Sequence, residues 1–200
     1  MNEKFTNIIR SMKANSIAFA VLDADNSSMF VLASPSSKDK IKNLLAGQGG
    51  KKIKDNKKEL YLYGMDRFIY YILGDLKVTV CFQISCKSTL NGEWIPLDKK
   101  INDAALNRVK VEDEYVYLSP EDDLCYVLAK CVYTEKKFAG ADVERIEKDL
   151  ARAETNVLMP KLEGVFFKFT RILIGMLNRK EFDRVIEELW CFADYEQEGA

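Results

Sequence analysis

The stretch SIAFAVLDADNSSMFVLASP, residues 16–35, decides how the fold is interpreted. The continuous apolar run over residues 16–22 predicts a buried strand, and the run over residues 29–33 predicts a second one. Between them, the polar residues 23–28 predict a tight turn. The Ser-Pro pair at residues 34–35 then predicts the start of a helix. The stretch therefore predicts strand, turn, strand and helix in close succession.

The flanking sequence extends this order in both directions. Upstream, residues 3–12 carry apolar side chains at helical spacing. Downstream, residues 68–73 and 76–83 predict two strands joined by a Gly74-Asp75 hairpin turn. Residues 60–63 predict a further strand, and residues 115–118 predict a last strand at an edge of the sheet. From Ser119 onward the apolar residues recur at helical spacing again, with one long helix over residues 162–176. The sequence thus predicts an α+β protein with a mixed sheet and flanking helices in residues 1–117, and a C-terminal helical lobe in residues 118–200.

Composition excludes several classes of function. The 200 residues include 30 Lys and Arg, 31 Asp and Glu, and no histidine, so the formal net charge is -1. This balance argues against nucleic acid as a partner. The lack of histidine excludes Ser-His-Asp and Cys-His nucleophile pairs and any imidazole base. No secretory signal or membrane-spanning run is expected, and the five cysteines are typical of reduced thiols, so we expect a cytoplasmic protein that does not bind membranes.

The predicted order of elements resembles the nucleotidyltransferase superfamily, its bacterial members in particular. Residues 76–83 resemble the hairpin strand of that family, residues 92–97 a segment that follows it, and residues 118–124 the first helix of the second lobe. The resemblance covers most of the chain. It implies a nucleotidyltransferase-like core followed by a helical lobe packed on it.

The resemblance also implies a catalytic pattern that this chain lacks. Two acids spaced Asp-x-Asp at the start of the second strand, with a third on the hairpin strand, hold two divalent metal ions in such proteins. Here Ser28 and Phe30 stand at the paired positions and Thr79 at the third. Hydroxyl and phenyl groups do not replace carboxylates as ligands for Mg²⁺. We therefore expect a pseudoenzyme without metal or cofactor, and a ligand pocket lined by Ser27, Ser28 and Thr79.

One pair of acids keeps an active enzyme in consideration. Asp23 and Asp25 have the required spacing a few residues upstream, and they are the fallback catalytic residues if Mg²⁺ is bound after all. The favoured interpretation of both is a polar turn, because Asp is a common turn residue and no apolar run directly follows Asp25. No third acid is evident on the hairpin strand.

Two further motifs could contact a ligand. The lysines at positions 51, 52, 54, 57 and 58 could bind phosphate, although a solvated loop is the favoured interpretation. The aromatic residues at positions 61, 63, 68, 70 and 71 could stack on bases, although strand aromatics more often pack within a sheet.

Three hypotheses about function follow. The leading one is an inactive nucleotidyltransferase-fold protein that binds a nucleotide-like ligand or a protein partner. The second is an active metal-dependent nucleotidyltransferase acting on a small molecule, sugar, protein or RNA through Asp23 and Asp25. The third is a plain protein-interaction module. Fold alone does not choose among them.

Overall fold

The computed structural model describes residues 3–53, 68–87, 94–96 and 105–197. The chain divides into two compact units. The first comprises residues 1–84 and 102–118, and the second comprises residues 85–101 and 119–200. Residues 85–101, which the sequence assigned to the core, thus group with the helical lobe. Among the described residues, no helix is long and apolar enough to cross a membrane.

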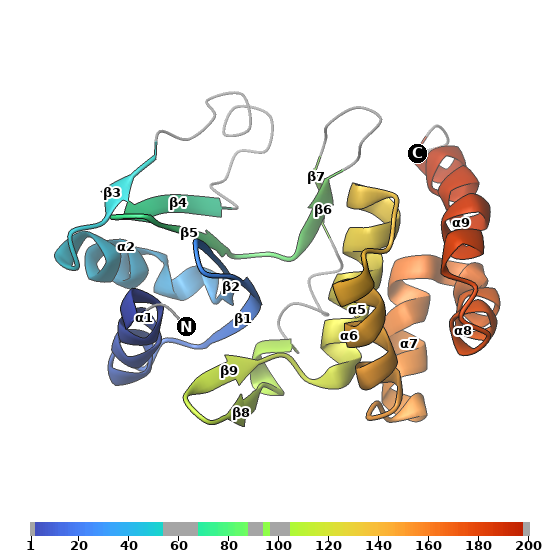
Figure 1. The fold of residues 1–200 in the computed structure, drawn as a ribbon, viewed down its shortest axis with the longest axis horizontal. Helices are drawn as coiled ribbons and strands as arrows, with labels where there is room; N and C mark the ends of the chain where they lie inside the picture. The colour runs from blue at the N-terminus through green and yellow to red at the C-terminus, as the bar shows by residue number, and fades with distance from the viewer. Residues whose placement is uncertain (1–2, 54–67, 88–93, 97–104, 198–200) are drawn as a thin grey trace. The chain divides into compact units, whose positions relative to one another are not determined.

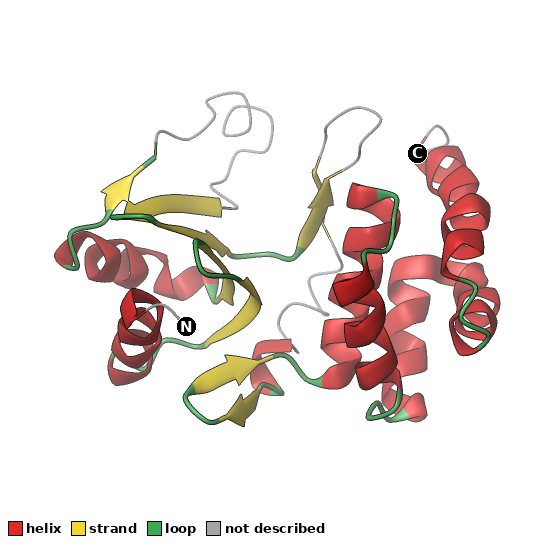
Figure 2. Ribbon diagram, in the orientation of Figure 1, coloured by secondary structure: helices red, strands yellow, loops and turns green. Residues whose placement is uncertain are grey.

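The first unit is built on a seven-stranded mixed sheet (Figures 1 and 2). The strand order is β3-β4-β5-β2-β1-β9-β8. The β2–β5 and β1–β9 pairs are parallel and the other pairs are antiparallel. The strands are β1 (Phe19–Ala24), β2 (Ser28–Ala33), β3 (Lys51–Lys52), β4 (Phe68–Leu73), β5 (Leu76–Cys81), β8 (Lys110–Glu112) and β9 (Tyr115–Tyr117).

Two helices pack against one face of this sheet. Helix α1 spans Glu3–Ala14 and α2 spans Lys38–Gly47, the latter preceded by the 3-10 turn η1 (Pro35–Ser37). Their buried side chains join alternate residues of the strands in one apolar core. Because side chains alternate along a strand, the intervening residues point to the opposite face. Because α1 and α2 cover the first face, the second face is where a ligand could contact this sheet.

The β4–β5 hairpin has the predicted two-residue turn, since Leu73 pairs with Leu76 across Gly74 and Asp75. Gly74 has a φ of 64°, a conformation that glycine adopts without the steric cost a Cβ imposes. This turn fixes the register of β4 against β5. It thereby sets which side chains of the two strands share a face.

The second unit is mainly helical. Its elements are β6 (Ser85–Lys87), β7 (Trp94–Pro96), α5 (Pro120–Ala129), the π-helix η2 (Lys130–Glu135), α6 (Gly140–Leu150), α7 (Thr155–Phe166), the 3-10 turn η3 (Phe167–Phe169), α8 (Thr170–Asn178) and α9 (Phe182–Gln197). Helix α5 begins as predicted, because Ser119 accepts a hydrogen bond from the Asp122 amide and Pro120 follows at the first helical position.

Three sequence expectations differ from the structure or lie outside it. The strand over residues 115–118 was expected at an edge of the sheet, but β9 lies between β1 and β8. The long helix expected over residues 162–176 is broken where Phe167 adopts φ 50° and ψ −132°. The strand expected over residues 60–63 lies outside the described residues.

Candidate functional site

The candidate site lies on the sheet face opposite α1 and α2. In the parallel register of β2 and β5, Phe30 lies beside Thr79 and Ser28 lies beside Lys77. Paired positions in a sheet share a face, and their sequence neighbours Met29 and Val78 belong to the core on the helix side. The structure therefore brings Ser28, Phe30 and Thr79 onto one face of two adjacent strands. All three side chains are half-buried.

The chemistry of these three residues does not fit the divalent metal ions that the resemblance implies. Two hydroxyls and a phenyl ring provide no negative charge, and Mg²⁺ is bound through carboxylates in such sites. Among the residues that the structure describes, no three histidine, cysteine, aspartate or glutamate side chains are grouped so as to hold a metal ion. No catalytic step through a metal ion is derived for this site.

Asp25 lies in the turn between β1 and β2, beyond the end of the strand. Its Oδ1 accepts hydrogen bonds from the Ser27 amide at 2.7 Å, the Ser27 hydroxyl at 3.0 Å and the Ser28 amide at 2.7 Å. Its Oδ2 accepts one from the Ser28 hydroxyl at 2.7 Å. The hydrogen bonds from Ser28 and Ser27 lower the pKa of Asp25 to about 2. Both carboxylate oxygens of Asp25 are therefore engaged in hydrogen bonds within the turn.

This turn also determines the environment of Ser27. The sequence analysis grouped Ser27 with Ser28 and Thr79 in one pocket. In the structure Ser27 is exposed and its hydroxyl donates to Asp25. Its carbonyl accepts a hydrogen bond of 2.8 Å from the Lys77 amide, which holds the turn against β5. The Ser27 side chain thus belongs to the turn, whereas Thr79 lies within the sheet.

Asp23 has a different position from Asp25. It lies on β1 opposite Phe30, directly after a break in the β1–β2 register at Leu22. Such a β-bulge changes the direction in which the following side chains point. Asp23 therefore lies in the same row of the sheet as Phe30 and Thr79, whereas Asp25 lies in the turn. The two acids do not alternate along one strand as an Asp-x-Asp metal site requires.

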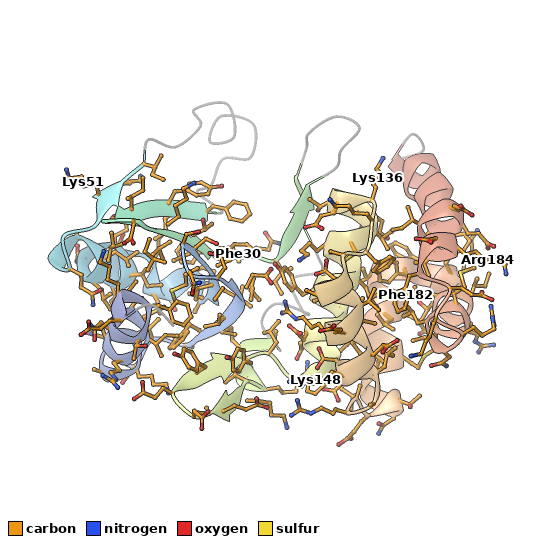
Figure 3. The ribbon with its side chains drawn as sticks, in the orientation of Figure 1. Phe30, Lys51, Lys136, Lys148, Phe182 and Arg184 are labelled. Atoms are coloured by element: carbon orange, nitrogen blue, oxygen red, sulfur yellow. The ribbon has the colours of Figure 1, made fainter. Side chains whose placement is uncertain are left out.

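A group of aromatic side chains lies beside Phe30 on this face. The ring of Phe68 stacks against Phe30 at 6.3 Å between centroids and against Tyr70 at 6.1 Å. Phe68 is buried, whereas Phe30 and Tyr70 are half-buried. Figure 3 labels Phe30 on its strand. Of the predicted aromatic group, Tyr71 packs instead into the core on the helix side, and Tyr61 and Tyr63 lie outside the described residues.

Sequence reasoning missed one charged residue of this face. Lys77 is exposed and pairs with Ser28 on β2 and with Ile72 on β4. The alternation of Lys77 and Thr79 with Leu76, Val78 and Val80 was the signal that places Lys77 on the same face as Thr79. The face therefore combines aromatic rings with a cationic side chain.

The second unit contains a separate group of charged residues. Lys161 pairs with Asp122, whose side chain is fully buried and which also accepts a hydrogen bond of 2.9 Å from the Ser119 hydroxyl. Arg145 donates two hydrogen bonds of 2.6 Å to Asp123. These pairs join α5 to α6 and α7. The acids at residues 121–123, which could have gathered a metal ion, are thus engaged by cations and by backbone amides.

Asp149 lies beside that group, near the end of α6. Burial, together with hydrogen bonding to Asp123 and the charge of Asp123, raises its pKa to about 7, while Arg145 opposes the rise. Its Oδ2 is buried and has no hydrogen-bond partner among the described residues. Burial beside another carboxyl group thus favours the protonated form of Asp149.

The mixed sheet, its two covering helices and the helical unit define an α+β, nucleotidyltransferase-like fold. The antibiotic-resistance factor ANT(2'')-Ia, an aminoglycoside nucleotidyltransferase, has a solution structure that reveals substrate-regulated conformation dynamics. That structure is similar to this chain with a TM-score of 0.50 and 7% sequence identity. The similarity covers 90% of this chain and 98% of that one.

A crystal structure of ANT(2")-Ia in complex with adenylyl-2"-tobramycin is also similar, with a TM-score of 0.49 and 6% identity. It covers 88% of this chain and 96% of the other. The chain matches no family model and no curated protein sequence. At these identities the structural similarity establishes the fold alone.

Proposed function

We propose that this chain is a nucleotidyltransferase-fold protein that does not transfer nucleotides and instead binds a nucleotide-like ligand or a protein partner. One observation carries the proposal. Phe30 and Thr79 lie side by side on adjacent strands at the positions where the family resemblance implies acids, and neither has a carboxylate. Without those acids the two metal ions that orient phosphates in this family have no ligands at the expected positions.

The choice of a nucleotide as the first ligand to test is supported by the fold. A nucleotidyltransferase is among the solved structures similar to this chain, and aromatic rings of the kind that stack on bases lie around Phe30. A protein partner is the alternative occupant of the same face.

The test is calorimetric titration of the full chain with ATP, GTP, CTP and UTP, each with Mg²⁺ and with EDTA. We expect binding that does not require the metal ion, together with no release of pyrophosphate. Binding that requires Mg²⁺, accompanied by turnover, would show an active enzyme and overturn the proposal. If none of the four nucleotides binds, a protein partner remains as the ligand. A pull-down with the purified chain then tests for it.

The active enzyme is a second candidate because Asp23 lies in the row of Phe30 and Thr79. Its test is the variant Asp23→Asn, compared with Asp39→Asn on the exposed surface of α2. Metal-dependent pyrophosphate release that disappears only in Asp23→Asn would establish this candidate. We expect no release above background from any of the three proteins.

A further inference from the structure

A row of paired residues, most of them exposed, crosses four strands at the candidate site. Lys51 on β3 pairs with Ile72 on β4, Ile72 pairs with Lys77 on β5, and Lys77 pairs with Ser28 on β2. Both lysines are exposed, and Ile72 between them is 37% exposed. Neighbouring strands are about 4.8 Å apart, so the two lysine backbones are separated by about 10 Å. Their long side chains can therefore reach one anionic group between them.

The aromatic row lies directly alongside this row of lysines. Tyr70, Thr79 and Phe30 are paired across β4, β5 and β2, and each lies two residues from the member of the lysine row on its own strand. Lys77 is the diagonal neighbour of Tyr70, a separation of about 7–8 Å that long side chains bridge. Phe30 and Lys51 are labelled in Figure 3. A ligand that spans the two rows thus meets rings at one end and ammonium groups at the other.

The acids near this face leave the two lysines available. Asp75, in the turn that precedes Lys77, pairs instead with Lys4 at 2.7 Å. Asp25 is engaged in its own turn by the hydrogen bonds described above. Neither Lys51 nor Lys77 forms an ion pair with another residue that the structure describes. The charge of this end of the face is therefore complementary to an anion.

We propose that this face binds a free nucleoside di- or triphosphate directly, with the base against Phe30 and Tyr70 and the phosphates on Lys77 and Lys51. No divalent metal ion takes part. The inference rests on the proposed function and names its ligand and the groups that hold it. Ammonium groups here replace the carboxylate-bound metal ions as the counter-charge for phosphate.

A mononucleotide fits this face better than a nucleic acid strand. Binding of single strands relies on a basic groove that follows the backbone over several nucleotides. Here the described face offers two lysines, with Asp23 at the far end of the aromatic row, and the whole chain has a net charge of -1. The two rows match one base and one phosphate chain.

The experiment measures ATP binding in EDTA by calorimetry for the full chain and for Lys77→Gln, Phe30→Leu and Lys52→Gln. Lys52 pairs with Tyr71, a core residue on the helix side, so Lys52→Gln is the matched control for the loss of a lysine. Losing one charge-assisted contact to phosphate is expected to weaken binding about tenfold in Lys77→Gln. Loss of the ring in Phe30→Leu is also expected to weaken binding about tenfold. The control should stay within about twofold, and thermal melts should confirm that all variants fold.

Adenosine and inorganic tripolyphosphate separate the two halves of the ligand. Phe30→Leu should weaken the binding of adenosine but not that of tripolyphosphate. Lys77→Gln should weaken the binding of tripolyphosphate but not that of adenosine. Metal-independent ATP binding that neither variant changes would overturn this inference and leave the proposed function standing. Binding only with Mg²⁺ would overturn both. No binding of ATP in EDTA would overturn this inference and leave the protein partner, and tighter binding of an oligonucleotide than of ATP would overturn the choice of a mononucleotide.

Discussion

The two units of the molecule use charge in different ways. Every buried polar or charged residue among those the structure describes belongs to the second unit, namely Ser119, Glu121, Asp122, Asp142, Asp149 and Thr170. In the first unit the described core is apolar, and its ion pairs, such as Lys4–Asp75 and Arg10–Glu114, are exposed. Buried charges must be paired or neutralised, whereas apolar packing has no such requirement. The described interior of the first unit is therefore held by apolar packing, whereas that of the second combines apolar packing with matched buried charges.

Removing one partner of a buried ion pair is expected to have the largest effect. Lys161→Met leaves Asp122 buried without its cation, which typically costs about 3–5 kcal/mol of unfolding free energy. Urea unfolding followed by tryptophan fluorescence measures it, because Trp94 and Trp190 both belong to the second unit. Lys137→Met, at an exposed position of the same unit, should change the midpoint little. Equal effects of the two variants would contradict the comparison.

An apolar truncation is the corresponding change in the first unit. Ile69 is fully buried on β4, and Ile69→Ala is expected to cost about 3 kcal/mol through lost burial and the cavity left behind. Ile72→Ala on the exposed face of the same strand is the matched control and should cost much less. Unfolding followed by far-ultraviolet circular dichroism measures both. A cost for Ile69→Ala no greater than that for Ile72→Ala would place the packed core elsewhere.

The buried acid of the second unit should make stability depend on pH. Burial and the neighbouring Asp123 raise the folded-state pKa of Asp149 to about 7, whereas an unfolded aspartate titrates near 4. Since the folded pKa lies above the unfolded one, the stabilising contribution of the protonated form is complete below about pH 4 and is lost as pH rises towards 7. The asparagine of Asp149→Asn cannot ionise, so this variant does not lose that stabilisation as pH rises.

The advantage of Asp149→Asn over the natural chain should therefore grow from pH 5 to pH 8, by on the order of 2 kcal/mol. Parallel urea titrations at the two pH values measure it. Asp183→Asn, at an exposed position of α9, serves as the control and should show no such trend. The same difference at both pH values would mean that Asp149 does not hold a proton in the folded chain.

The smallest effect is expected for an exposed ion pair of the first unit. The side chains of Lys4 and Asp75 are 49% and 75% exposed, so water and salt screen their attraction. Lys4→Ala should leave the unfolding midpoint unchanged within error, in low salt as well as in high salt. A clear loss of stability would show that the first unit also relies on matched charges.

The sequence predicted the features of the fold that depend on local patterns. The alternation of Val78 and Val80 with Lys77 and Thr79 indicated the core face of β5, and the apolar run over residues 29–33 predicted β2. The register that places Phe30 beside Thr79 came from the structure. Buried thiols outside disulfide bonds were expected, and this is confirmed for Cys81, Cys125 and Cys131 among the described residues. Whether the face around Phe30 binds a ligand stays a prediction.

Features that depend on contacts distant in sequence were missed. The helical spacing of apolar residues continues through Phe167, so nothing in the pattern marked the break there. The internal position of β9 follows from its pairing with β1, which lies far away in the sequence. Likewise, the sequence does not indicate that Asp123 meets Arg145 or that Asp149 is buried beside them, because charged residues are normally exposed.

The pairing of β1 with β9 has a consequence during synthesis. Val21 leaves the ribosome well before its partner Tyr117, which follows only after the hairpin and the first strands of the second unit have been made. Until then β1 is an open edge of the nascent sheet, and open edges favour pairing with other chains. Sheets closed by such distant contacts also form slowly. A slowly translated chain is thus exposed to misassembly from the time β1 emerges until residues 110–117 emerge and cover it.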